Sequence, residues 1–128
     1  MKIINLPHLA SAGGVAMEDA ISGLHQTLGR RLPDQYVALL READGFRLDN
    51  GIFIYSVDEV FERNETFEVS KYAPGYLAIG DDGGGRSILI RFDDDQVFVV
   101  DQGSMDPDDM ELIGSSLSMW IENGCSLE

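Results

Sequence analysis

The sequence contains a single cysteine, Cys125, so no disulfide bond can form within the chain. Structural disulfides are typical of oxidising compartments, and their absence fits a reducing cytoplasm. No apolar run approaches the roughly 20 residues that a membrane-spanning helix needs. The first residues carry one lysine, Lys2, and are soon interrupted by Pro7, which is a poor match to a secretion signal. We therefore expect a cytoplasmic protein without a membrane-spanning segment.

Basic residues are also scarce. Nine lysines and arginines stand against 23 aspartates and glutamates, which gives a net charge of −14. Such a charge repels nucleic-acid phosphates and anionic lipids and attracts basic partners, so we expect no nucleic acid and no membrane as partner. Two explanations of the acidity remain open. It either only keeps a cytoplasmic protein dispersed, or it attracts a protein partner with a basic surface.

Residues that usually carry catalysis are few. His8 and His25 are the only histidines, and no G-x-S-x-G motif marks a nucleophile. The glycine-rich stretch 80–86 lies between two predicted strands and has no lysine, which favours a hairpin connection over a phosphate-binding loop. The acidic run 93–95 lacks the ligand spacing of a calcium site. We expect no catalytic residue, no cofactor and no metal, although acid–base chemistry by surface carboxylates stays an alternative because no pair is singled out.

The 128 residues, of which 44% are hydrophobic, are enough for one folded domain with its own core. Alternating and β-branched residues predict three consecutive antiparallel strands, Tyr76–Gly80, Ser87–Phe92 and Val97–Asp101. In the second strand, Ile88 and Ile90 face one side and Leu89 the other. The third is apolar at successive positions, which predicts burial on both faces.

The rest of the chain predicts helices around these strands. Apolar spacing predicts a helix over 17–28 that ends at Gly29, and a second one from Pro33 to Asp44-Gly45. Segments 46–48 and 51–55 predict a hairpin, and 57–69 a frayed helix or an irregular crossing. Asp106 is expected to cap a last helix whose apolar face is Met110, Ile113, Leu117, Trp120 and Ile121. We thus predict an α+β fold, a largely antiparallel sheet with helices mainly on one face, as a single domain over 17–128 after a flexible lead-in over 1–16.

Several short motifs in this order resemble the SUKH superfamily, named partly after yeast regulators of cell-wall synthesis. The motifs are Leu32-Pro33-x-x-Tyr36-x-x-Leu39-Leu40 with Asp44-Gly45, then Ala73-Pro74-x-Tyr76-Leu77-Ala78-Ile79-Gly80-Asp81-Asp82-Gly83-Gly84-Gly85, then Val97-Phe98-x-Val100, and Ser116-Leu117-x-x-Trp120-Ile121. The resemblance covers roughly residues 20–123. One departure is Asp44, where the family often has asparagine. Both residues suit the turn that ends a helix.

The resemblance implies an α+β fold without known catalytic residues. Bacterial members of the superfamily are assigned as immunity proteins that neutralise toxins, often nucleases, and eukaryotic members look like regulatory adaptors. A nuclease needs a basic surface, which an acidic inhibitor can cover. We therefore expect a non-enzymatic immunity protein that binds a toxin stoichiometrically, with an adaptor for an endogenous protein as the alternative. The predicted partner contacts are Asp81 and Asp82 in one connection and Asp93, Asp94 and Asp95 in the next.

Overall fold

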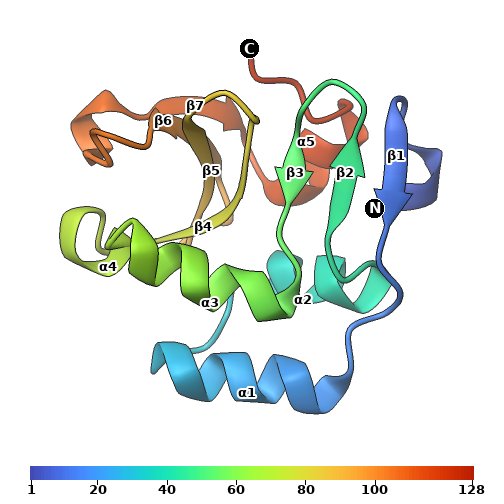
Figure 1. Ribbon diagram of the computed structural model, residues 1–128, viewed down its shortest axis with the longest axis horizontal. Helices are drawn as coiled ribbons and strands as arrows, with labels where there is room; N and C mark the ends of the chain where they lie inside the picture. The colour runs from blue at the N-terminus through green and yellow to red at the C-terminus, as the bar shows by residue number, and fades with distance from the viewer.

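The computed structural model describes residues 1–128, and a seven-stranded sheet runs through its centre (Figure 1). The strands lie side by side in the order of the chain, and every neighbouring pair is antiparallel. They are β1 (Leu9–Ala12), β2 (Phe46–Leu48), β3 (Phe53–Ile54), β4 (Tyr76–Asp81), β5 (Arg86–Arg91), β6 (Val97–Asp101) and β7 (Glu111–Gly114). The helices are α1 (Glu18–Leu28), α2 (Asp34–Glu42), α3 (Val57–Thr66), α4 (Val69–Tyr72) and α5 (Leu117–Glu122), with short 3-10 turns η1 (Ile3–Asn5) and η2 (Pro107–Asp109). The predicted α+β class is confirmed.

The three predicted central strands are confirmed as β4, β5 and β6. Along β5, Ile88 and Ile90 pack into the main core, while Leu89 packs into a second cluster on the opposite face. Four successive residues of β6, Val97 to Val100, are buried, because β5 and β7 flank the strand and both faces are covered.

The helices cover mainly one face of the sheet. The main core, 26 buried residues, joins apolar side chains of α1, α2, α3 and α5 to one face of β4–β6. The other face carries a cluster of six buried residues, which includes Val69 of α4 and Ala73, the residue that follows this helix. Figure 1 shows α1, α2 and α3 lying along one side of the sheet.

The first two helices follow the predicted pattern. Ile21 and Leu24 of α1 are buried, and Gly29 ends the helix at φ 71°, in the left-handed region that glycine adopts without strain. Tyr36 and Leu40 of α2 are buried as predicted. Met17, however, precedes α1 and is 74% exposed, so the apolar stripe starts at Ile21.

The segment 57–69, expected to be a frayed helix or an irregular crossing, forms a regular helix over Val57–Thr66, and residues 67 and 68 then turn the chain into α4. Ser56 and Glu59 form a reciprocal capping box, in which the Glu59 carboxylate accepts from the Ser56 backbone N–H at 3.1 Å. Val60 and Asn64 of α3 are buried. Glu62 and Glu65 of the same helix are exposed on its outer face.

The expectation of a loose segment over 1–16 is wrong for its middle part. Ile3 is 2% exposed, and β1 pairs with β2 through Leu9 opposite Leu48 and Ala12 opposite Phe46. Three of the four residues of β1 are exposed, so pairing rather than side-chain burial makes them a strand. That the domain itself begins at residue 17 stays a prediction.

The single helix predicted after Asp106 is also wrong. Asp106 does cap a helical turn, since its carboxylate accepts from the Asp108 N–H at 2.9 Å, but this turn is the three-residue η2. Strand β7 follows, and a new helix, α5, begins after the cap Ser116. Gly114 explains the break, because its backbone lies against Trp120 so closely that a Cβ atom would be 2.7 Å from the Trp120 Cβ. The chain therefore folds back on itself there.

Candidate protein-binding surface

The acidic charge is concentrated in the last part of the chain. Residues 92–128, which form β6, β7 and α5, contain ten aspartates and glutamates and no lysine, arginine or histidine. They carry −10 of the net −14, whereas residues 1–91 contain 13 acids and nine bases and carry the remaining −4. The last 37 residues are therefore strongly anionic, and the rest of the chain is close to balanced.

The connection between β6 and β7 forms the densest part of this charge, which we call the acidic edge. Its members are all exposed: Asp101, Asp106, Asp108, Asp109 and Glu111. Local bonds hold some of them in place, because Asp101 accepts from the Gly103 N–H at 2.8 Å and Asp109 accepts from the Ser104 hydroxyl. None of the six ion pairs in the protein involves a residue of the acidic edge. These carboxylates are therefore available to a basic partner.

The protein's own basic side chains are largely occupied elsewhere. Five of the nine form ion pairs with acids, and three more lie over aromatic rings. The ion-paired residues are Arg31, Arg41, Lys71, Arg86 and Arg91, and the ring-stacked ones are Arg30, Arg47 and Arg63. Lys2 is the ninth, and none of the nine forms an ion pair with the acidic edge.

The predicted contacts Asp81 and Asp82 hold the turn between β4 and β5. Asp82 accepts hydrogen bonds from the Gly84 N–H at 2.8 Å and the Arg86 Nε at 2.8 Å, and its side chain is only 10% exposed. Burial raises the pKa of Asp82, but hydrogen bonds from Arg86 and from the loop backbone outweigh it and hold the pKa below its ordinary value. Asp81 accepts from the Gly83 N–H and from the Tyr55 hydroxyl, at 2.9 and 2.8 Å.

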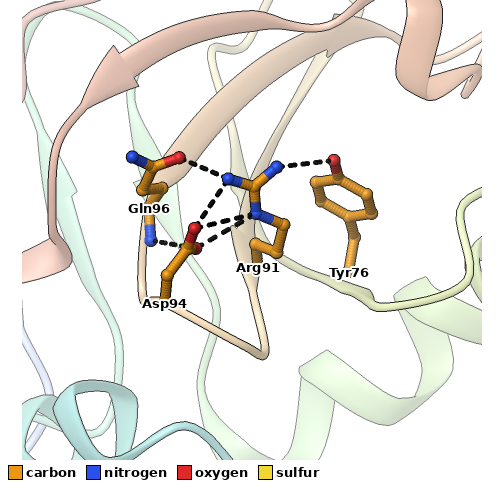
Figure 2. A network of polar contacts seen from close by, with 4 residues as sticks. All are labelled: Tyr76, Arg91, Asp94 and Gln96. Carbon is orange, nitrogen blue, oxygen red and sulfur yellow. Dashed lines mark hydrogen bonds and ion pairs between the residues drawn. The ribbon is translucent and has the colours of Figure 1, made fainter.

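The predicted contact Asp94 is bound to Arg91 at the end of β5 (Figure 2). Arg91 donates to both carboxylate oxygens of Asp94, to the Gln96 side chain, and to the Tyr76 hydroxyl at 3.4 Å. Hydrogen bonding to Arg91 lowers the pKa of Asp94 below its ordinary value. Figure 2 shows the guanidinium lying between the tyrosine and the acidic turn.

The two neighbours of Asp94 differ from it. Asp93 is exposed and makes no side-chain bond or ion pair, so it is free to contact a partner. Asp95 has a backbone φ of 61°, and burial together with the charges of Asp34 and Asp94 raises its pKa. Its carboxylate therefore adds repulsion at a turn that is already acidic.

The structure does not bring the two predicted acidic connections together. β5, which has six residues, runs between them, so they lie at opposite ends of a strand of roughly 20 Å. The turn after β4 instead shares its end of the sheet with the acidic edge, because Arg86 of β5 is paired with Asp101 of β6. Sequence reasoning missed the acidic edge because Asp106–Glu111 was interpreted as a helix start. The absence of any basic residue after Arg91 was the signal that could have found it.

Residues that could carry other chemistry have structural partners. His8 lies 3.1 Å from Asp49 on the exposed surface, and the His25 Nδ1 accepts from the Leu32 N–H at 2.9 Å. Cys125 is buried, which raises the pKa of its thiol to about 12. No group of three or more His, Cys, Asp or Glu side chains is arranged to hold a metal ion. None of the helices is both long enough and apolar enough to span a membrane.

A cleft of about 630 Å³ opens where the end of α1, the α3–α4 region and the start of β4 meet. Phe61, Tyr76 and Phe92 line it, and the Arg30 guanidinium lies 3.6 Å from the centre of the Phe92 ring. Its acids are Glu65 and Glu68, and Glu68 is paired with Lys71 at 3.5 Å. The charges of the cleft are thus mixed, in contrast to the acidic edge.

These observations define an acidic α+β domain with a single sheet in chain order and an acidic edge that forms no ion pair within the protein. The sequence model of the SMI1/KNR4 family (SUKH-1) matches residues 16–123, so the chain belongs to this family. The resemblance inferred from its motifs is thereby confirmed. The chain is also 32% identical over 74 residues to a Bacillus subtilis (strain 168) protein called "Uncharacterized protein YnaB". This match spans 58% of the chain and 49% of the relative, about half of that protein.

Proposed function

We propose that the protein is an immunity protein that neutralises a bacterial toxin by binding it stoichiometrically. Membership of the SMI1/KNR4 family supports the proposal, because the superfamily resemblance implies this role for bacterial members. The observation that carries it is the acidic edge, whose five carboxylates are exposed and form no ion pair within the protein. A surface of this kind attracts a basic protein surface and repels phosphates.

A nuclease toxin is the partner that this charge fits best. A nuclease holds its substrate through lysine and arginine contacts to phosphates, so its active-site surface is cationic. An inhibitor with a matching anionic surface associates rapidly and excludes the nucleic acid from the same residues. In this proposal the acidic edge and the exposed Asp93 contact the toxin, while Asp81, Asp82, Asp94 and Asp95 act mainly by shaping the two turns.

Co-expression with toxin domains encoded in the same genome tests the function directly. We expect the protein to restore growth of cells that express one of these toxins, and the purified pair to form a one-to-one complex. Rescue of no toxin, together with recovery of a housekeeping protein as the stable partner, would favour the regulatory adaptor instead.

Charge variants then test the surface. The triple variant Asp106→Asn, Asp108→Asn and Asp109→Asn removes three charges but keeps amide oxygens for the local hydrogen bonds of η2. We expect its association rate with the toxin to fall roughly tenfold at low salt, and the remaining rate to depend less on salt. The matched control, Asp19→Asn, Asp58→Asn and Glu62→Gln, makes the same change from −14 to −11 at exposed sites on α1 and α3. An equal loss in the control would mean that net charge alone matters and that the acidic edge is not the contact.

A further inference from the structure

The sheet face opposite the main core is only partly covered. α4 and the β6–β7 connection bury one part of it, where Leu89 and Val100 pack against Val69 and Met105. Toward β7 the cover ends, and Leu112 is 54% exposed although it lies in a strand. A single exposed leucine is ordinary on a protein surface, so the neighbours of Leu112 decide whether it marks a binding site.

Three apolar side chains adjoin one another here: Leu112 is 54% exposed, Tyr76 is half-buried and Phe98 is 8% exposed. Leu112 of β7 is the direct cross-strand neighbour of Phe98 of β6. The Phe98 ring in turn meets the Tyr76 ring edge to face, with the ring centres 5.4 Å apart. We call Tyr76, Phe98 and Leu112 the apolar strip.

Arg91 fixes the strip in place. Its guanidinium lies 4.9 Å from the centre of the Phe98 ring and donates to the Tyr76 hydroxyl, while Asp94 and Gln96 hold it from the other side (Figure 2). The buried Phe98 ring and the half-buried Tyr76 ring therefore form a rigid base for the exposed Leu112 side chain. Rigid tyrosine, phenylalanine and arginine side chains are the residues most enriched at the centres of protein interfaces.

The negative charges beside the strip indicate the chemistry of a partner that could bind there. Glu111 precedes Leu112 directly, and Asp108 and Asp109 precede the half-buried Met110, so the acidic edge borders the strip along β7. A second copy of this protein would bring two acidic edges together, each with five exposed carboxylates, which disfavours self-association through this face. A protein segment with an apolar side chain between basic ones could pack its apolar side chain on the strip and pair its basic side chains with the acidic edge.

We propose that the apolar strip is the anchor of the partner contact and that its occupant is an apolar side chain flanked by lysine or arginine on a partner protein. The proposal rests on the proposed function, since it names the part of the partner-binding surface that supplies short-range binding energy. The acidic edge guides approach, and the strip holds the bound partner. Variants of the edge should accordingly change the association rate, and variants of the strip should change the dissociation rate.

A peptide titration tests this without knowledge of the toxin. The isotope-labelled full chain is titrated with a capped Gly-Lys-Trp-Lys-Gly peptide, and amide shifts are followed by NMR. Gly-Lys-Ser-Lys-Gly and Gly-Glu-Trp-Glu-Gly are the comparison peptides. We expect the Lys-Trp-Lys peptide alone to shift the amides of Phe98 and Leu112 together with those of the acidic edge. Leu112→Ser should weaken its binding about tenfold, because the substitution removes the exposed part of the strip.

Met119→Ser is the matched control, because Met119 is 46% exposed but belongs to α5 on the opposite face. It should leave peptide binding unchanged. Shifts confined to other faces, equal binding of the Lys-Ser-Lys peptide, or an unchanged affinity in the Leu112→Ser variant would overturn the proposal. So would concentration-dependent dimerisation through the strip, measured by analytical ultracentrifugation. Failure of growth rescue would instead refute the immunity function and leave the peptide result standing, so the two failures are distinguishable.

Discussion

Asn64 is a buried polar side chain that joins α3 to β4, and its replacement by alanine should destabilise the fold. Its side-chain amide donates to the Ala78 carbonyl at 2.8 Å, and its carbonyl oxygen accepts from the Ala78 N–H at 2.9 Å. The same amide also donates to the Val60 carbonyl at 2.7 Å. Strand β3 pairs with β4 only at Gly80 and Asp81, so Asn64 takes the place of a strand partner farther along β4.

The expected loss follows from the two backbone groups that the substitution leaves without a partner. Each unpaired buried group costs about 1–3 kcal/mol, and alanine recovers up to about 0.7 kcal/mol through its higher helix propensity than asparagine. Asn64 borders the cleft, through which water can reach part of the site, so the lower half of this range applies. We expect the free energy of unfolding to fall by about 2 kcal/mol, which corresponds to a melting temperature roughly 5–12 °C lower.

Urea denaturation followed by far-UV circular dichroism measures this loss. The neighbouring Glu65→Ala substitution is the control, because Glu65 is exposed on the same helix and forms no ion pair. It should change the free energy of unfolding by less than about 0.5 kcal/mol. If both variants lost a similar free energy of unfolding, or if Asn64→Ala lost less than about 0.5 kcal/mol, the Asn64 amide would not be an important hydrogen-bond partner of the Ala78 backbone.

Further predictions concern packing, pH and the thiol. Gly114→Ala should lower the free energy of unfolding by about 1–3 kcal/mol, measured by urea denaturation, because the added methyl group would lie 2.7 Å from the Trp120 Cβ; unchanged stability would contradict the account of the β7–α5 corner. Asp95→Asn should raise the stability at pH 7 and give no gain near pH 3. Burial and the Asp34 charge raise the pKa of Asp95 above its ordinary 3.8, so the folded state binds this proton more tightly than the unfolded state does. The ionised carboxylate therefore lowers the free energy of unfolding as the pH rises past the raised pKa. A stability gain in Asp95→Asn that does not depend on pH would contradict this cause. Asparagine also accepts the left-handed backbone at this position. Cys125, whose thiol pKa is raised by burial to about 12, should resist iodoacetamide at pH 8 in the folded protein and react once guanidinium unfolds it; equal rates in both states would contradict its burial.

The strands and the first two helices were predictable because their signals are local. Residues 76–101 alternate apolar positions with turns, and Gly29 and Pro33 mark the boundary between α1 and α2. The last helix could not be placed by the same reasoning. Met110, Ile113 and Leu117 have helical spacing, yet the first two lie on a strand or just before it. The approach of Gly114 to Trp120, which breaks the run, exists only in the folded protein. β1 was missed because only its pairing with β2 makes it a strand.

The candidate surface was only partly predictable. That the protein is acidic is evident from composition, and the hypothesis of a basic partner depends on that alone. Which carboxylates are free depends on tertiary contacts: the side chains of Asp82 and Asp94 look available in the sequence, but Arg86 and Arg91 bind them. The apolar strip joins residues from β4, β6 and β7, and no local pattern brings them together.

The chain-order arrangement of the sheet has a consequence for how the protein folds. No strand pairs with any but its neighbours in sequence, so only the two connections that contain helices, from β1 to β2 and from β3 to β4, close long loops. Low contact order of this kind speeds folding, because little chain entropy is lost before native contacts form. The compact β4–β6 hairpins can form first, and the two outermost strands can add last from opposite ends of the polypeptide.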